Sequence, residues 1–237
     1  MAAKETILFI PGHMCDERLF APQIAALKGR YNIVVAGLKA GEAFETYIDN
    51  ALEAVGDNRF NLVGLSMGGM LAAQMAAQHP RRVLRLALLS TTVEPEVPER
   101  AQTRRKRIER AKKAGLETIA REELAPSYLA AAHKTRTDLI DTVVAMAVDH
   151  GVDVFAAQSA AMTARRDCRN DLPGYKGPVL VLCGEEDRLF SVEKHKDIAE
   201  LFEHSELVIQ SAIGHLPVLE APEATNAALE TWLSRRV

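Results

Sequence analysis

Short apolar runs separated by segments of helical character are the feature that most restricts how this chain of 237 residues can fold. The apolar runs occupy residues 6–10, 31–36, 60–65, 83–90, 178–183 and 206–210. Segments that favour helices lie between or after them, at residues 17–27, 44–55, 67–78, 192–202 and 222–234. Strands that alternate with helices in this way form a mainly parallel sheet flanked by helices. The sequence therefore predicts an α/β fold.

This alternation stops between residues 94 and 166, where no strand-like run appears and the sequence is typical of several helices. Pro95 and Pro98 stiffen the entrance to this segment, and Pro173-Gly174 marks the return to strand and helix alternation. We therefore expect residues 1–93 and 167–237 to form one α/β core. Residues 94–166 are expected to form a helical cap, inserted after the strand that follows residues 60–65.

The composition limits the kinds of molecule, such as nucleic acid, membrane lipid or small molecules, with which we expect the protein to interact. The formal net charge of −3 gives the whole molecule no attraction to nucleic acid or to an anionic membrane. No apolar run is long enough to span a bilayer, and the run at residues 6–10 is too short for the core of a signal peptide. A cytoplasmic protein that acts on a small molecule is the resulting expectation, and its oligomeric state stays open.

The cysteines are three in number and far apart, at Cys15, Cys168 and Cys183. An odd number at these distances argues against a disulfide framework, and the spacing does not match that of a zinc site. We therefore expect neither a structural metal nor a cofactor.

A candidate nucleophile lies in the segment Gly64-Leu65-Ser66-Met67-Gly68, between an apolar strand-like run and an alanine-rich helical run. A serine hydroxyl is a weak nucleophile that must project from a sharp turn toward a base. Nearby backbone N–H groups must also stay available to an oxyanion. The flanking glycines suit such a turn because they have no Cβ atom. Ser66 is therefore the candidate nucleophile.

Two later segments supply the other members of a catalytic set. Asp187 follows the apolar run at residues 178–183, and the carboxyl ends of parallel strands are where active sites assemble. Glu185 and Glu186 are neighbouring alternatives, but only Asp187 precedes the apolar pair Leu189-Phe190, which could bury its carboxylate. His215 follows the last strand-like run, between Gly214 and Leu216. We predict that Asp187 orients His215 and that His215 is the base.

These three motifs, in the chain order Ser66, Asp187 and His215, resemble the α/β-hydrolase superfamily. The resemblance covers the chain apart from the cap segment. It implies a serine nucleophile and an oxyanion hole built from backbone N–H groups, which correspond here to His13 and Met67. Pro11 stands where the family usually carries histidine in its His-Gly-x motif. Because the donor is a main-chain group, His13 can still fill this role.

The expected function is hydrolysis of a small or medium carboxylic ester, or a related acyl compound, through an acyl-enzyme on Ser66. The acyl pocket is expected to be apolar and bordered by Met14, Met70, Leu189, Phe190 and Leu216. Two alternatives stay open. One is a lyase or a hydrolase of carbon–carbon bonds that uses the same triad, and the other is a noncatalytic ligand-binding protein with the same fold.

Basic residues crowd residues 100–113 of the cap segment, where Glu109 is the single acidic residue. Such a run could bind phosphate, a nucleotide-bearing thioester or RNA. The absence of interleaved aromatic residues argues against single-stranded nucleic acid. The simpler interpretation, which we favour from the sequence, is a solvated helix face with Ala101, Ile108 and Ala111 turned inward.

Overall fold

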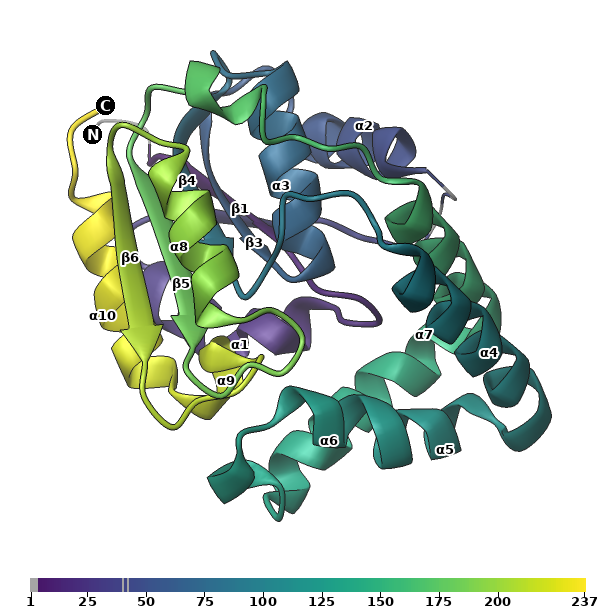
Figure 1. Cartoon of the computed structure of the whole chain (residues 1–237). Helices are drawn as coiled ribbons and strands as arrows, with labels where there is room; N and C mark the ends of the chain where they lie inside the picture. Colours follow the sequence, from purple (N-terminus) through teal and green to yellow (C-terminus); the bar gives the residue numbers. More distant parts are fainter. Residues whose placement is uncertain (1–3, 40, 42) are drawn as a thin grey trace.

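The computed structural model describes residues 4–39, 41 and 43–237. Residues 1–3, with which the expected core begins, lie outside the described residues. Within the described residues, the strands form one six-stranded sheet in the order β2-β1-β3-β4-β5-β6, and each neighbouring pair is parallel. Figure 1 shows this sheet with helices on both faces. The strands are β1 (Thr6–Ile10), β2 (Asn32–Val35), β3 (Phe60–Leu65), β4 (Val83–Leu89), β5 (Val179–Gly184) and β6 (Ser205–Gln210).

The predicted fold class is confirmed, and the two faces of the sheet explain it. In β1, Ile7 and Phe9 belong to one buried cluster, whereas Leu8 and Ile10 belong to the other. This period of two places successive side chains on opposite faces. The first cluster is covered by α1 (Ala21–Leu27) and α10 (Pro222–Leu233). The second is covered by α2 (Phe44–Val55), α3 (Met67–Gln78) and α8 (Val192–Glu200).

The expected helix at residues 17–27 differs in detail, because a 3₁₀ turn, η1 (Glu17–Phe20), precedes α1. Asp16 caps this turn by accepting a hydrogen bond from the backbone N–H of Arg18. Two further elements were not expected from the sequence. They are the 3₁₀ turn η4 (Leu172–Gly174) and the short helix α9 (Pro217–Glu220), which directly precedes α10.

Between β4 and η4, all the regular elements of the described chain are helical, and we call them the inserted helices. They are α4 (Pro98–Ala114), α5 (Leu116–Ile119), η2 (Ala120–Leu124), α6 (Ala125–Tyr128), η3 (Ala131–His133) and α7 (Thr137–Ala164). In Figure 1 they extend to one side of the sheet and below it. Most of their buried side chains, among them Ile119, Val143 and Phe155, belong to the same cluster as α1 and α10, whereas Ala161 and Met162 of α7 belong to the cluster on the other face. α7 is kinked at Gly151, which has a φ of 82°. No helix in the described part of the chain is both long and apolar enough to cross a membrane.

The helix α3 lies so close to β1 and β3 that two glycines are required between them. A Cβ atom on Gly68 would lie 1.9 Å from the carbonyl oxygen of Ile10. A Cβ atom on Gly64 would lie 2.2 Å from the carbonyl oxygen of Gly68. Both neighbours are backbone atoms in the middle of the fold, so they cannot move aside as a flexible side chain would. The start of α3 is therefore held against the carboxyl ends of both strands.

We predict that Gly68→Ala lowers the free energy of unfolding by about 3 kcal/mol or more, because the added methyl overlaps a backbone carbonyl in the core. Urea denaturation of the variant and the parent protein measures this change. Gly29→Ala is the matched control, since a Cβ atom there has no neighbour within 4 Å. Equal stability of the two variants would contradict the close approach described here.

Candidate active site

Ser66 lies at the turn between β3 and α3 in a backbone conformation that non-glycine residues rarely adopt, with φ 57° and ψ −116°. Such conformations cost free energy and persist where the surrounding structure enforces them. Here the Ser66 N–H donates to the Leu89 carbonyl at 2.9 Å, and the Thr91 hydroxyl donates to the Ser66 carbonyl at 2.7 Å. β4 and the loop after it therefore hold the turn, which leaves the Ser66 side chain at the wall of a cavity.

Asp187 and His215 form a buried pair, although 28 residues separate them in the chain. The Nδ1 atom of His215 lies 2.8 Å from Oδ2 of Asp187. The other carboxylate oxygen, Oδ1, accepts hydrogen bonds from the backbone N–H groups of Leu189 at 2.8 Å and Phe190 at 3.1 Å. Both oxygens are thus occupied, and the carboxylate is oriented toward the imidazole by its own loop.

These contacts change the pKa of Asp187. Burial alone would raise it, but the charge and hydrogen bond of His215, together with the two backbone N–H groups, outweigh burial and lower the pKa below its usual value. The ionised carboxylate therefore stabilises the fold above the pKa of an unfolded aspartate, about 3.9. This contribution is lost as the pH falls through the lower pKa of the folded protein.

The second imidazole nitrogen of His215, Nε2, is buried and has no hydrogen-bond partner in the described part of the chain. The ring lies between two aromatic rings, with centroid distances of 5.4 Å to Tyr128 and 5.8 Å to Phe190. Both aromatic residues line the same cavity as Ser66. No hydrogen bond joins Ser66 to Nε2 in these described residues, and in ligand-free sites such bonds are often long and shorten when substrate binds.

Two backbone N–H groups have the properties of oxyanion donors. Met67 is the first residue of α3, a position where an N–H has no acceptor within the helix. His13 lies in the loop after β1, and its N–H makes no hydrogen bond to any described residue. The neighbouring N–H groups are occupied, since Met14 donates to Oε1 of Gln158 at 2.8 Å and Cys15 donates to the Gly12 carbonyl at 3.1 Å. α7, through Gln158, thus holds this loop.

The His13 side chain is buried beside the ring of Phe155, with ring centroids 5.1 Å apart. Burial lowers the pKa of the His13 imidazole well below its usual value, and the positive charges of Arg104 and Arg107 lower it further. His13 is therefore a neutral ring at the wall of the cavity.

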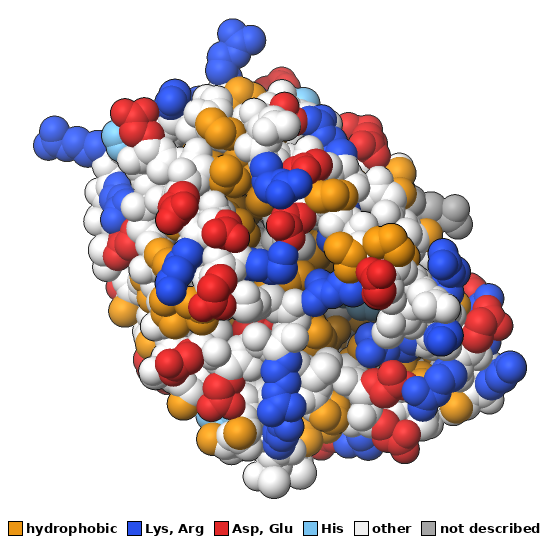
Figure 2. Space-filling model, viewed as in Figure 1, with side chains coloured by type: hydrophobic (Ala, Val, Ile, Leu, Met, Phe, Trp, Pro, Cys, Tyr) orange, Lys and Arg blue, Asp and Glu red, His pale blue; other side chains and the backbone are white. Residues whose placement is uncertain are grey.

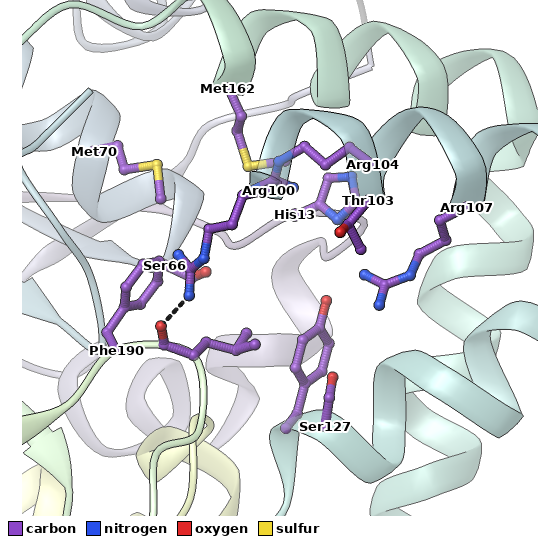
Figure 3. A pocket seen from close by; sticks show the side chains of 12 residues that line it. His13, Ser66, Met70, Arg100, Thr103, Arg104, Arg107, Ser127, Met162 and Phe190 are labelled. Atoms are coloured by element: carbon purple, nitrogen blue, oxygen red, sulfur yellow. Dashed lines mark hydrogen bonds between the residues drawn. The ribbon is translucent and has the colours of Figure 1, made fainter. Parts of the chain in front are cut away.

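The cavity next to Ser66 has a volume of about 160 Å³. Figure 2 shows a hollow in this face of the molecule, bordered by Lys and Arg side chains, and Figure 3 shows the cavity from close by. An apolar protein cavity of roughly 150 Å³ takes a ligand of the size of benzene. Of the residues expected at the acyl pocket, three line this cavity: Met70, Leu189 and Phe190.

Met14 and Leu216 were also expected at this pocket, but the structure places both in the buried cluster on the α1 and α10 face. Met14 has a positive φ of 59°, and this turn directs the side chain into the core. Leu216 follows His215, whose ring is turned toward Asp187, and it directly precedes α9, against the same cluster. Met14 is next to His13 and Leu216 is next to His215 in the sequence, but neither side chain lines the cavity.

The contribution of the inserted helices to this cavity was not expected from the sequence. They supply Arg100, Thr103, Arg104, Arg107, Ser127, Tyr128 and Met162 to its wall. The expectation of a fully solvated basic face on α4 is therefore wrong for three arginines, although Ala101 and Ala111 are buried as expected. The spacing of Arg100, Arg104 and Arg107 was the available signal, because it matches one face of a helix.

Glu220, at the end of α9, holds the loop that carries His215. Its carboxylate is buried and accepts hydrogen bonds from the backbone N–H groups of Gly214, at 3.1 and 3.2 Å, and Leu216, at 3.1 Å. It also accepts one from the N–H of Ala130 at 2.8 Å and lies 2.9 Å from Nδ1 of His133. The Glu220 carboxylate thus connects the residues before and after His215 to the inserted helices.

We predict that Glu220→Gln lowers the free energy of unfolding by about 3 kcal/mol. An amide has one acceptor oxygen, so buried N–H groups lose their partner and the new NH₂ group faces other donors. Chemical denaturation measures the change, with Glu223→Gln as control, because Glu223 is an exposed acid at the start of the adjacent helix α10. If Glu220→Gln were as stable as this control, the carboxylate would not hold the loop.

Known proteins share this architecture. RutD of Agrobacterium fabrum, a relative named as a carbamate hydrolase, is 26% identical over 254 residues, which cover 98% of this chain and 94% of RutD. A thermophilic esterase from Thermogutta terrifontis, solved with malate bound, has a TM-score of 0.87 and 26% identity, over 98% of this chain and 90% of that chain.

The enol-lactonase from Burkholderia xenovorans LB400 has the same fold, with a TM-score of 0.88 and 23% identity, over 99% of this chain and 93% of that one. Residues 40–222 also match the family model for the alpha/beta hydrolase fold. That match spans more than half of the chain, and the sheet order and strand-to-helix turn agree with it, so the chain belongs to the alpha/beta hydrolase family.

Proposed function

We propose that the protein is a serine hydrolase that cleaves a small carboxylic ester or lactone through an acyl-enzyme on Ser66. The observation that carries this proposal is the buried Asp187–His215 pair beside the cavity that Ser66 lines. One imidazole nitrogen is hydrogen-bonded to a carboxylate, and the other has no hydrogen-bond partner among the residues that the structure describes, which is the arrangement that a general base requires.

In the proposed reaction, the Ser66 oxygen attacks the carbonyl carbon of the ester while Nε2 of His215 takes the serine proton. The carbonyl π electrons move to oxygen, and the N–H groups of His13 and Met67 stabilise the resulting oxyanion. The tetrahedral intermediate collapses, the carbon–oxygen bond to the alcohol breaks, and His215 gives its proton to the departing alkoxide. Water then repeats the sequence on the acyl-enzyme, which releases the carboxylic acid and restores Ser66.

The size and lining of the cavity support a small substrate. A volume of about 160 Å³ suits an acyl group of a few carbons rather than a long fatty chain. Met70, Met162 and Phe190 supply apolar contacts for such a group. The names of the relatives, a carbamate hydrolase and an esterase, agree with attack on a carbonyl carbon that bears a heteroatom.

In this proposal, the inserted helices are a cap that covers the cavity beside Ser66. Tyr128, at the end of α6, accepts a hydrogen bond from the His215 N–H through its backbone carbonyl at 2.6 Å. Its ring lies beside the imidazole and lines the cavity. Contacts of this kind exclude water from the base, which strengthens the electrostatic interactions of the site.

We expect Ser66→Ala to reduce kcat for small para-nitrophenyl esters on the order of a millionfold, because the nucleophile is removed. Release of para-nitrophenolate, followed by absorbance, measures the rate, and an unchanged melting temperature shows that the variant is folded. Retention of the parent activity in folded Ser66→Ala would disprove the acyl-enzyme mechanism.

Asp187→Asn is expected to reduce kcat roughly ten-thousandfold. An amide donates its N–H₂ toward Nδ1 or favours the wrong tautomer of His215, so Nε2 no longer accepts the serine proton. Glu186→Gln is the control, since its carboxylate binds the Ala131 N–H rather than the imidazole. A similar loss of kcat in both variants would contradict the specific role of Asp187.

A further inference from the structure

Three arginines of α4 enter the cavity of the proposed active site. Arg100, Arg104 and Arg107 are four and three residues apart, which places their side chains on one face of the helix. Figure 3 shows Arg100 and Arg107 pointing from α4 into the space that Ser66 and His13 border. Among the described residues that line this cavity, the charged ones are these three arginines.

Arg104 and Arg107 are each anchored through one nitrogen and leave the others available. Nε of Arg104 donates to Glu96 at 2.7 Å, and Nε of Arg107 donates to Glu123 at 3.0 Å. The terminal nitrogens of both guanidinium groups make no hydrogen bond to the described chain. Their side chains are 18% and 28% exposed, so contact with water is limited. The guanidinium groups of Arg104 and Arg107 are therefore fixed in position at the cavity wall, and each keeps N–H donors available for a ligand.

The carboxylates around these arginines do not balance their charge. Glu96 also binds Arg165, at 3.1 Å, and Glu123 also binds Arg110, at 2.5 Å. Each carboxylate is thus shared by two arginines, and Arg100 adds a further positive charge without a carboxylate partner among the described residues. An excess of positive charge in a partly buried cavity is costly unless an anion offsets it.

Arg100 differs from the other two because its guanidinium is already occupied. It donates to the Leu189 carbonyl and lies over the ring of Phe190, 4.9 Å from the centroid. These contacts are in the loop that carries Asp187. Arg100 therefore holds this loop and adds its charge to the cavity, whereas Arg104 and Arg107 keep free donors for a ligand.

We propose that Arg104 and Arg107 bind a carboxylate of the substrate, so that the preferred substrate is a small ester or lactone of a dicarboxylic acid. A guanidinium group presents two parallel N–H donors that match the two oxygens of a carboxylate. The inference rests on the proposed hydrolysis at Ser66 and names the substrate class of that site. In a cavity of this size, the second carboxylate is a few carbons from the ester carbonyl.

Two esters that differ by one group test the preference. Para-nitrophenyl pentanoate and mono-para-nitrophenyl glutarate share the leaving group and chain length, but the second carries a terminal carboxylate in place of a methyl group. We expect the parent enzyme to show a kcat/KM roughly tenfold or more higher for the glutarate ester. This ratio is expected to fall as salt is added, since ions screen the attraction between charges.

Arg104→Gln and Arg107→Gln should each reduce the glutarate-to-pentanoate ratio of kcat/KM by roughly tenfold to a hundredfold, the usual effect of a lost hydrogen bond to a charged group. Arg105→Gln removes the same charge from an exposed position of α4 and should leave the ratio unchanged. If Arg104→Gln does not fold, Arg107→Gln alone tests the effect on the ratio, because Arg107 is the more exposed of the two.

Binding to Ser66→Ala separates this inference from the proposed reaction. Calorimetry with monomethyl glutarate is expected to show binding that Arg107→Gln weakens roughly tenfold in the Ser66→Ala background and that methyl pentanoate does not reproduce. Hydrolysis of the esters by Ser66→Ala would disprove the proposed acyl-enzyme mechanism but not the carboxylate site. Equal kcat/KM for the two esters in the parent enzyme, or an equal effect of Arg105→Gln and Arg107→Gln, would overturn the carboxylate site.

Discussion

The approach of α3 to the backbone of β1, with no side chain between them, is the constraint on which the site depends. Gly68 makes this approach possible, because any Cβ atom there would overlap the Ile10 carbonyl. The chain must then turn sharply between β3 and α3, and Ser66 takes the strained conformation of that turn. One packing requirement thus fixes the position of the serine and leaves the first N–H of α3 beside it, where the oxyanion of the proposed reaction would form.

The opposite side of the cavity depends on a second requirement, the joining of the inserted helices to the sheet domain. Most of their buried side chains continue the cluster beneath α1 and α10, and Ala161 and Met162 join the cluster on the other face, so the inserted helices pack against both. The Glu220 carboxylate adds polar contacts at the point where the two parts meet, next to His215. Since the same contacts hold the imidazole loop and the inserted helices, the position of His215 and the shape of the cavity are coupled.

Much of this arrangement follows from local patterns in the sequence. The apolar runs predict the strands because a buried parallel strand needs apolar residues on both faces, as β1 and β3 show. Ser66, Asp187 and His215 each follow a strand, and parallel strands bring their carboxyl ends to one edge. The arginines were missed because the direction of a charged side chain depends on distant partners. The spacing of the arginines within α4 indicates that they share one face of the helix, but it does not indicate where that face turns. Glu96 and Glu123, which bind Arg104 and Arg107 beside the cavity, lie outside α4.

The positive charge of the cavity also affects the proposed reaction. Charges on Arg100, Arg104 and Arg107 favour the negative tetrahedral intermediate of the proposed reaction, because opposite charges attract strongly where contact with water is limited. The Asp187 carboxylate beside the imidazole is the negative group that would stabilise the imidazolium formed in the same step. Asp187 has both oxygens held by the imidazole and by backbone N–H groups, so its charge stays in place. An anionic substrate would add a negative charge to this cavity, so the three arginines would stabilise both its carboxylate and the intermediate formed from its ester group.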